Sequence, residues 1–387
     1  MRPGARQPHA ANRHPGYDEI VQAAAIKQLA RECGFELVGI APAEPLANDF
    51  ARYAAWADSG MAGRMSYLTD HRAEKRRDPR TLLSAARSVI CVGKLYNRPS
   101  PESHPGDATF SRYAWTRDYH DVLRELLEQL AGRIAEHTPH EWKACVDTAP
   151  LLERSYARRA GLGWIGKNQC LINEPRGSWF FLGELLTSLV IEPDSPPPDR
   201  CGTCTRCIDA CPTQAIVPCQ ESPNETAGQH SGNSSPYQLD ASRCITYLNI
   251  ELKGPIPEDF RAAMGTNIIG CDICQDVCPW NRRAPVTEDT AFEAAYDPAP
   301  PLESLASLTK EEFENQYRNT PVTRPKYDGF LRNVAVAMGA SPHEQFREPL
   351  DRLARHASPV VAEHAQWALH RLNGSPRSNE CVEVSHS

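Results

Sequence analysis

The chain has 387 residues, of which 41% are hydrophobic and 24% are charged, and its formal net charge at pH 7 is −7. This composition is ordinary for a globular chain of two or three domains, and the acidic balance argues against a wholly basic nucleic-acid-binding protein, although it is compatible with local basic patches. No apolar run reaches the roughly 18 residues that span a bilayer, so we expect no membrane-spanning segment.

The first 18 residues are basic but contain no apolar core. We interpret residues 1–18 as a disordered tail rather than a secretory signal, and we expect a cytoplasmic protein.

Residues 19–195 are predicted to form a mixed α/β domain. Apolar residues at helical spacing predict helices over 19–33, 117–137 and 150–160. Runs that are rich in β-forming residues predict strands over 35–42, 86–96 and 142–147. A further apolar run, 178–191, is predicted to be a buried strand, with a helix as the alternative.

The stretch GLGWIGKN begins at Gly161 and fits two phosphate-loop patterns. Gly161, Gly163 and Gly166 match the dinucleotide fingerprint, and Lys167 nearly completes a Walker A loop. Both patterns require a strand before the glycines, whereas a helix is predicted there. We therefore predict a helix C-cap at Gly161 and a tight turn rather than a nucleotide site.

A proline-rich linker, 194–200, leads into a cysteine-rich module that is predicted to span 196–285. Within the module, the polar segment 220–236 is predicted to be an exposed insertion. A helical domain over 286–372 follows, and residues 373–387 are predicted to be a second disordered tail. The helices of the domain 286–372 are predicted over 330–340, 348–357 and 359–372. They form either a pair of HEAT-type repeats or a plain helical cap.

Most of the 14 cysteines lie in the cysteine-rich module 196–285. Without an export signal, such a concentration indicates metal sites rather than disulfides. The first run, Cys-x2-Cys-x2-Cys-x3-Cys-Pro, is the bacterial ferredoxin pattern, in which three thiolates bind one [4Fe–4S] cluster and the fourth turns toward another. The alternative, a zinc knuckle, uses paired Cys-x2-Cys elements and needs no Cys-Pro step.

A second run, Cys-x2-Cys-x3-Cys-Pro, begins at Cys271 and lacks one cysteine. If the last thiolates of the two runs cross over, the second cluster needs one more ligand, for which Cys219 and Cys244 are the candidates. We prefer Cys244, because its segment has helical character whereas Cys219 borders the polar insertion. The predicted ligands are Cys201, Cys204, Cys207 and Cys278 for one cluster, and Cys211, Cys244, Cys271 and Cys274 for the other.

Several long motifs together resemble the epoxyqueuosine reductases. They are VDTAPLLERSYARRAGLGWIGKN at 146–168, the ferredoxin run, RCITYLNIELKG at 243–254 and GCDICQDVCPWN at 270–281. The resemblance covers residues 19–372. It implies an α+β multidomain fold, with a nitroreductase-like cobalamin-binding α/β domain, a bacterial ferredoxin-type two-cluster module and C-terminal HEAT-like helices.

The resemblance also implies an activity and a cofactor site. The expected reaction reduces epoxyqueuosine to queuosine at the wobble position of tRNA, the last step of queuosine biosynthesis, with two [4Fe–4S] clusters relaying electrons to base-off cobalamin. No lower-axial histidine is implied, so we interpret His120 as a structural or substrate-pocket residue. Lys167 and Asn168 are candidates for polar contact with the corrin amide arms or with tRNA. The implied cobalamin contacts are Arg76, Ser111, Asp147, Leu171, Leu182, Thr246, Cys271 and Asp272.

Asp147 is the predicted catalytic residue. Loss of the epoxide oxygen requires protons, and a carboxylic acid near the reacting carbon can supply one. Burial over an apolar corrin is expected to raise the pKa of Asp147 and to keep it protonated. The alternative is that Asp147 caps the helix that is predicted to begin at Pro150.

The implied substrate is a tRNA with a GUN anticodon that carries epoxyqueuosine, with its target base flipped out of the stack and with contacts from Glu251 and Lys253. Positive charge for this tRNA is predicted at 71–80, 158–159 and 281–283, although such stretches are also typical of solvated surfaces. We expect a monomer that receives electrons from a flavodoxin- or ferredoxin-type donor. The competing hypotheses are a reductive dehalogenase-like enzyme acting on a small molecule, a non-catalytic ferredoxin-type electron carrier and an RNA-binding scaffold.

Overall fold

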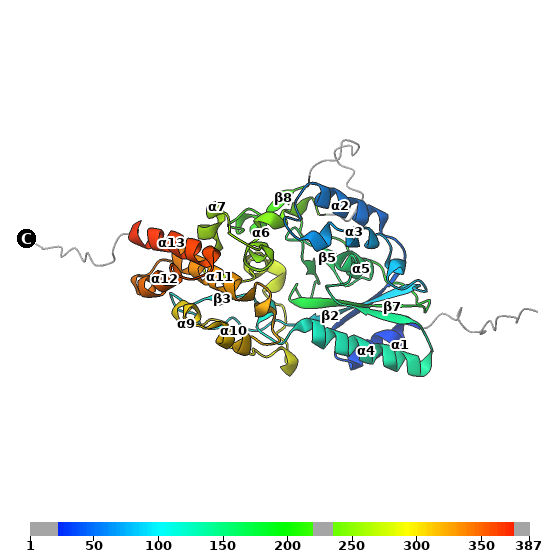
Figure 1. Cartoon of the computed structure of the whole chain (residues 1–387). Helices are drawn as coiled ribbons and strands as arrows, with labels where there is room; N and C mark the ends of the chain where they lie inside the picture. Colours follow the sequence, from blue (N-terminus) through cyan, green and yellow to red (C-terminus); the bar gives the residue numbers. More distant parts are fainter. Residues whose placement is uncertain (1–21, 220–234, 375–387) are drawn as a thin grey trace, which may run out of the picture.

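The computed structural model describes residues 22–219 and 235–374. Figure 1 shows an N-terminal α/β part at one end, C-terminal helices at the other end and short helices and strands between them. The predicted tail 1–18 and most of the segments 220–236 and 373–387 lie outside the described residues. The described ends of these segments differ from the prediction. Residues 373–374 continue the last helix instead of belonging to a disordered tail, and Ser235 is buried instead of exposed.

A four-stranded antiparallel sheet forms the centre of the N-terminal part. Every residue of β2 is buried, because strands pair with it on both sides and helices cover both faces. All four predicted strands are confirmed, and 178–191 contains a strand rather than a helix. The order across the sheet is β1 (Leu37–Pro42), β2 (Ser88–Leu95), β7 (Phe180–Thr187) and β4 (Trp142–Cys145).

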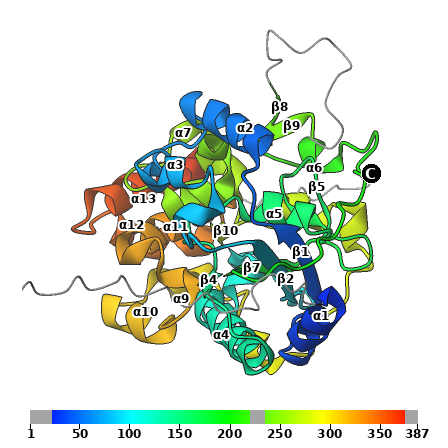
Figure 2. The same cartoon turned by 90° about the vertical axis from the view of Figure 1, so that its right-hand side faces the viewer.

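Helices cover both faces of this sheet (Figure 1, Figure 2). α1 (Ala23–Glu32) and α4 (Tyr119–His137) lie together against one face, where Leu127 is fully buried. α5 (Glu153–Arg159) lies against the other face and buries Tyr156. Full burial of one such side chain contributes about 1.5–3 kcal/mol, so the two apolar layers hold the sheet between them.

The chain between β4 and α5 differs from the prediction. A helix is predicted from Pro150, but α5 begins at Glu153, and within the described residues its N-cap Leu152 makes no side-chain capping bond. Asp147 adopts the left-handed backbone conformation, with a φ of 49°, which short polar residues tolerate better than most others. The interpretation of Asp147 as a helix cap is therefore wrong, because the chain turns at Asp147 and buries Leu151 before the helix begins.

The glycine-rich stretch after α5 forms a helix end and a close backbone contact. Gly161 has a φ of 82°, as expected of a residue that ends a helix. The next residues form β5 (Trp164–Ile165), which pairs with β6 (Leu171–Ile172). A Cβ atom on Gly163 would lie 2.1 Å from the carbonyl oxygen of Ile172. The prediction that a helix precedes these glycines is confirmed, so the phosphate-loop patterns do not apply.

The central part is joined to the N-terminal part by a parallel strand pair. β10 (Asn267–Ile269) pairs with β3 (Thr109–Phe110), and two short helices, α6 (Arg206–Asp209) and α8 (Ile273–Asp276), lie beside each other. The other elements of the first two parts are α2 (Ala47–Asp58), which the sequence analysis overlooks, α3 (Arg72–Lys75), β8 (Ile216–Pro218), β9 (Tyr237–Leu239), the π-helix Tyr247–Glu251 and α7 (Glu258–Arg261).

The C-terminal part is helical, as predicted. The predicted helices over 330–340, 348–357 and 359–372 correspond to α11 (Lys326–Ala340), α12 (Arg347–Leu353) and α13 (Pro359–Gly374), and α11 packs against both of the others. Within residues 22–219 and 235–374 no helix is long and apolar enough to cross a membrane. The other α-helices described in this part are α9 (Leu302–Ala306) and α10 (Lys310–Gln316).

Arg332 of α11 ties the C-terminal helices to the central part. Its side chain is 1% exposed, and its guanidinium donates hydrogen bonds to the backbone carbonyls of Leu248, Leu252 and Gly254 at 2.7–2.9 Å. Burial lowers the pKa of Arg332 to about 10, so the side chain remains charged at neutral pH. A cation at the carbonyl end of a helix is favourable, and here it also satisfies buried carbonyl groups.

Replacement of Arg332 by Met should therefore lower the free energy of unfolding by about 2–4 kcal/mol, because the buried carbonyls lose their donors. Arg352→Met is the matched control, since Arg352 lies on α12 with its side chain 45% exposed, and it should change the free energy by less than about 0.5 kcal/mol. Chemical denaturation measures both values, and equal losses would contradict the role of the buried arginine.

Candidate active site

A cavity of about 850 Å³ lies where the three parts of the chain meet. Phe180 of β7, the π-helix, α8 and Arg324, which precedes α11, contribute to its walls. A concave and largely apolar site with a few converging polar groups is typical of cofactor and substrate binding. All but one of the residues predicted to contact cobalamin line this cavity: Arg76, Ser111, Asp147, Leu171, Leu182, Thr246 and Cys271.

The cysteines of the central part gather around two cavities. Within the described residues no three potential ligands converge closely enough to hold a single metal ion. Cys211, Cys244, Cys271 and Cys274 line the large cavity, and Cys201, Cys204, Cys207 and Cys278 line a second cavity of about 230 Å³.

Cys219, the alternative ligand, lies apart from both sets. Its Sγ atom is 3.6 Å from the carbonyl oxygen of Ser235 and 3.9 Å from the guanidinium of Arg52. The structure therefore brings Cys244, and not Cys219, to the other cysteines of the large cavity. Cys170, which the sequence analysis does not consider, also lines this cavity.

Lys167 does not act as the sequence analysis expects. Its side chain is 8% exposed, and Nζ donates hydrogen bonds to the carbonyl oxygens of Gly202 and Cys204 at 2.8 and 2.9 Å. Asn168 lines the large cavity, and its Nδ2 lies 3.4 Å from the carbonyl oxygen of Cys274. Lys167 thus stabilises the loop that carries a cysteine run, rather than reaching toward a corrin or tRNA.

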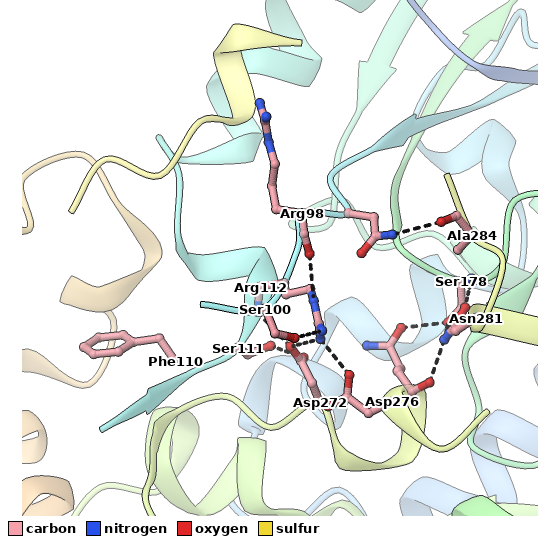
Figure 3. Close-up of polar contacts among 12 residues, drawn as sticks. Arg98, Ser100, Phe110, Ser111, Arg112, Ser178, Asp272, Asp276, Asn281 and Ala284 are labelled. Atoms are coloured by element: carbon pink, nitrogen blue, oxygen red, sulfur yellow. Dashed lines mark hydrogen bonds and ion pairs between the residues drawn. The ribbon is translucent and has the colours of Figure 1, made fainter. Parts of the chain in front are cut away.

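Asp272 is the one predicted cobalamin contact that, among the described residues, does not line the cavity. Its buried carboxylate accepts a hydrogen bond from Ser111 Oγ and another from the Arg112 backbone N–H at 2.8 Å (Figure 3). Arg112 also donates to Asp276 at 2.7 Å. Burial raises the pKa of Asp272, and these donors only partly offset that rise. Asp272 therefore positions Ser111, which does line the cavity.

Asp147 belongs to a hydrogen-bonded group of acids and bases at the cavity. Its Oδ2 accepts a hydrogen bond from the Tyr119 hydroxyl at 3.1 Å and lies 3.1 Å from His120 Nε2. His120 Nδ1 lies 2.6 Å from Oδ1 of Asp118, the N-cap of α4. Because both ring nitrogens of His120 have carboxylate partners, its geometry agrees with a pocket residue rather than a metal ligand.

The protonation of this group differs from the expectation. Burial raises the pKa of Asp147, but the hydrogen bond from His120 and the positive charges of Arg324 and His120 outweigh it and lower the pKa overall. Burial lowers the pKa of His120, but its two carboxylate partners raise it to about 9. At neutral pH the proton therefore resides on His120. The expectation of a protonated Asp147 is wrong, because its cationic neighbours come from distant segments.

Arg324 is a cavity residue that the sequence analysis overlooks. Its guanidinium lies 3.3 Å from Glu251 Oε1, and its carbonyl oxygen lies 3.3 Å from Lys253 Nζ. Burial lowers the pKa of Arg324, but Tyr113, Tyr119, Asp147 and Glu251 raise it overall. A single arginine in a polar turn forms no pattern in the sequence, and only the packing of the C-terminal helices brings it here.

Most arginines of two predicted basic segments, 71–80 and 158–159, form ion pairs with nearby acids. Arg76 is an exception, because it is buried and lines the cavity, where it donates to the carbonyl oxygens of Tyr67 and Arg72. The ion pairs in segments 71–80 and 158–159 are Arg72–Asp70, Arg77–Glu74, Arg80–Asp78, Arg158–Asp49 and Arg159–Glu44.

Two family models match the chain. Residues 76–148 match the model described as "Epoxyqueuosine reductase QueG, DUF1730". Residues 200–281 match a 4Fe-4S double cluster binding domain. The first match covers β2, α4, β4 and Asp147, and the second contains both cysteine runs.

Similar proteins cover nearly the whole chain. The epoxyqueuosine reductase of Xanthomonas campestris pv. campestris is 42% identical over 91% of this chain and 96% of its own length. That of Pseudomonas aeruginosa is 40% identical over 94% of this chain and 98% of its own. The crystal structure of an epoxyqueuosine reductase with an epoxyqueuosine-modified tRNA-Tyr stem loop is 30% identical, covers 90% of this chain and 89% of that chain, and has a TM-score of 0.79.

Replacement of Asp118 by Asn tests the charge assignment in the cavity. Asn preserves the helix cap but removes the negative charge that Asp118 places beside His120. The pKa of His120 should therefore fall from about 9 toward its ordinary value of about 6.5. The stability that His120 contributes through its raised pKa is complete below about pH 6.5 and is lost as the pH rises through about 9. Imidazole NMR titration measures the shift, and Asp121→Asn, at an exposed position of α4, should leave it unchanged. An unchanged pKa in Asp118→Asn would contradict the assignment.

Proposed function

This chain belongs to the epoxyqueuosine reductase family, and we propose that the cavity around Asp147 is where it reduces epoxyqueuosine to queuosine at the wobble position of tRNA. The reaction removes the epoxide oxygen and consumes two electrons and two protons. One observation carries the proposal: the predicted cofactor contacts, four cysteines and a group of proton-carrying side chains all line or adjoin one cavity.

The chain carries a 4Fe-4S double cluster binding domain, and its ligands are assigned here from spacing and placement. We assign Cys201, Cys204, Cys207 and Cys278 to the cluster of the smaller cavity. We assign Cys211, Cys244, Cys271 and Cys274 to the cluster beside the large cavity. In this arrangement electrons from an external flavodoxin- or ferredoxin-type donor reach the substrate site through the second cluster.

The large cavity fits cobalamin. Its volume of about 850 Å³ and the apolar side chains of Leu171, Phe180 and Leu182 suit one face of a corrin, while Arg76 and Ser111 offer polar contacts. Thr246 and Cys271 complete the proposed set, with Asp272 acting through Ser111. When bound, cobalamin would supply reducing power at a metal centre beside the substrate carbon.

The protein's own contribution to the chemistry is the supply of protons. His120 holds a proton at Nε2, and Asp147 Oδ2 lies 3.1 Å away, within the reach that proton transfer requires. Asp147 can take this proton and pass it to the departing oxygen, while the Tyr119 hydroxyl fixes its carboxylate. A low resting pKa for Asp147 is compatible with this role, because the donor is the His120–Asp147 pair.

The substrate and the domain architecture follow from the same family assignment. The proposed tRNA has a GUN anticodon, and Glu251 and Lys253, which both contact Arg324, contribute to its binding. We assign a nitroreductase-like fold to residues 19–195, the cluster module to 196–285 and HEAT-like helices to 286–372. The enzyme is proposed to act as a monomer in the cytoplasm, where tRNA is modified.

Replacement of Cys244 by Ala tests the cluster assignment. After anaerobic reconstitution, Cys244→Ala should lose about one of the two clusters, seen as half the iron and acid-labile sulfide, since a thiolate ligand is removed. The matched control Cys219→Ala should keep both clusters. The opposite result would transfer the ligand role to Cys219.

Replacement of Asp147 by Asn tests the proton-donor role. With both clusters and cobalamin reconstituted, the wild-type enzyme and a strong one-electron donor should remove one oxygen from an epoxyqueuosine-bearing stem loop, as nucleoside mass analysis would show. Asp147→Asn should keep its cofactors but lose at least about 100-fold in rate. Wild-type activity in the variant would disprove the role of Asp147. A fully loaded wild-type enzyme that removes no oxygen would favour the dehalogenase-like alternative.

A further inference from the structure

The reaction needs a second proton, and the structure contains a second carboxyl group beside Asp147. We propose that Glu153 supplies this proton by passing it to Asp147, as a positioning residue that does not itself touch the substrate. The inference builds on the proposed function, because it concerns the same cavity and the same reaction.

Glu153 lines the same cavity as Asp147, which lies in the turn that precedes α5. Glu153 is the first residue of α5. Asp147 has a left-handed backbone conformation, and its backbone N–H is one of the groups that lower the pKa of Glu153. One carboxyl oxygen of Glu153, Oε1, is buried and has no hydrogen-bond partner in the described part of the chain. An unsatisfied buried oxygen costs stability, so this placement calls for a functional explanation.

The surroundings of Glu153 keep its carboxyl group protonated at neutral pH. Burial and the negative charge of Asp147 raise its pKa to about 8, while the Asp147 N–H, Arg154 and His120 oppose the rise. Behind Glu153 lie the buried Glu184 of β7 and its strand neighbours Cys91 and Cys145. Burial raises the pKa of each of these groups.

The proposed steps balance in atoms and charge. The epoxide gains two electrons from the reduced clusters and two protons, both of its C–O bonds break, and the products are an alkene and water. The first proton moves from His120 Nε2 through Asp147 to the oxygen as the first C–O bond breaks. The second moves from Glu153 through Asp147 to the resulting hydroxyl, which leaves as water. His120 and Glu153 then regain protons from solvent.

Glu184 offers a matched control. It is 0% exposed, and neither of its oxygens has a hydrogen-bond partner among the described residues. Unlike Glu153, it is not among the residues that line the large cavity, although burial and the negative charges of Glu153 and Asp147 raise its pKa. Replacement of Glu184 by Gln thus makes the same chemical change in the same core, at a carboxyl group that does not line the cavity.

The test uses the holoenzyme, with both clusters and cobalamin bound, in single turnovers of an epoxyqueuosine-bearing stem loop from pH 6 to 10. Glu153→Gln should bind the stem loop with unchanged affinity but react about 100-fold more slowly. The wild-type rate should decrease near pH 8 as Glu153 loses its proton, and this decrease should be absent from the pH profile of Glu153→Gln. The decrease near pH 9 that His120 causes should remain. The variant should also show a larger solvent isotope effect. Glu153→Asp should recover part of the rate, and Glu184→Gln should react within about twofold of wild type.

Two results would overturn the inference while leaving the proposed function intact. One is a Glu153→Gln enzyme with the wild-type rate and pH profile. The other is a Glu184→Gln enzyme that loses as much activity as Glu153→Gln, since the effect would then come from disturbance of the core. A wild-type holoenzyme that removes no oxygen at any pH would instead overturn the proposed function itself.

Discussion

The buried carboxylate of Asp272 lies at the junction between the N-terminal and central parts of this protein and helps to join them. It accepts hydrogen bonds from Ser111 and from the backbone of Arg112, which lie 161 and 160 residues away along the chain. The adjacent strands β3 and β10 pair in parallel, and Gly270 has a φ of 70°, with so little room that a Cβ atom would lie 2.5 Å from that of Ser111. Buried polar groups of this kind tolerate few alternative arrangements, because an unpaired carboxylate would be costly.

The cavity beside this junction brings cysteines and acid–base groups together. Cys271 and Cys274, on either side of Asp272, line the cavity, and Asp147, which contacts His120, lines it as well. Arg324 adds a positive charge from the segment before α11. A reaction that consumes both electrons and protons needs both kinds of group at one site.

The C-terminal helices are tied to the same junction. Asn333, next to Arg332 on α11, donates hydrogen bonds to the carbonyl oxygens of Asn249 and Ile268 at 2.6 and 2.9 Å. Asn249 in turn exchanges hydrogen bonds with Gly270 at 2.9 and 3.1 Å. A chain of buried amides therefore runs from α11 to the residue before Cys271. The helices at the far end of the molecule thus help to position a cysteine of the cavity.

The sequence by itself determined the strands of the main sheet, the helices that cover it and the two cysteine runs, because apolar periodicity and short ligand spacings depend on neighbouring residues. It also indicated the family, through long ordered motifs. It could not place the start of α5, because the left-handed turn at Asp147 has no local signal, and it could not show the charge of Asp147. His120 and Asp147 are 27 residues apart, and Arg324 is more distant still. Protonation states, the position of Glu153 and the contribution of Arg324 were decided only by the tertiary structure, because pKa values depend on burial and on charges that the fold alone brings together.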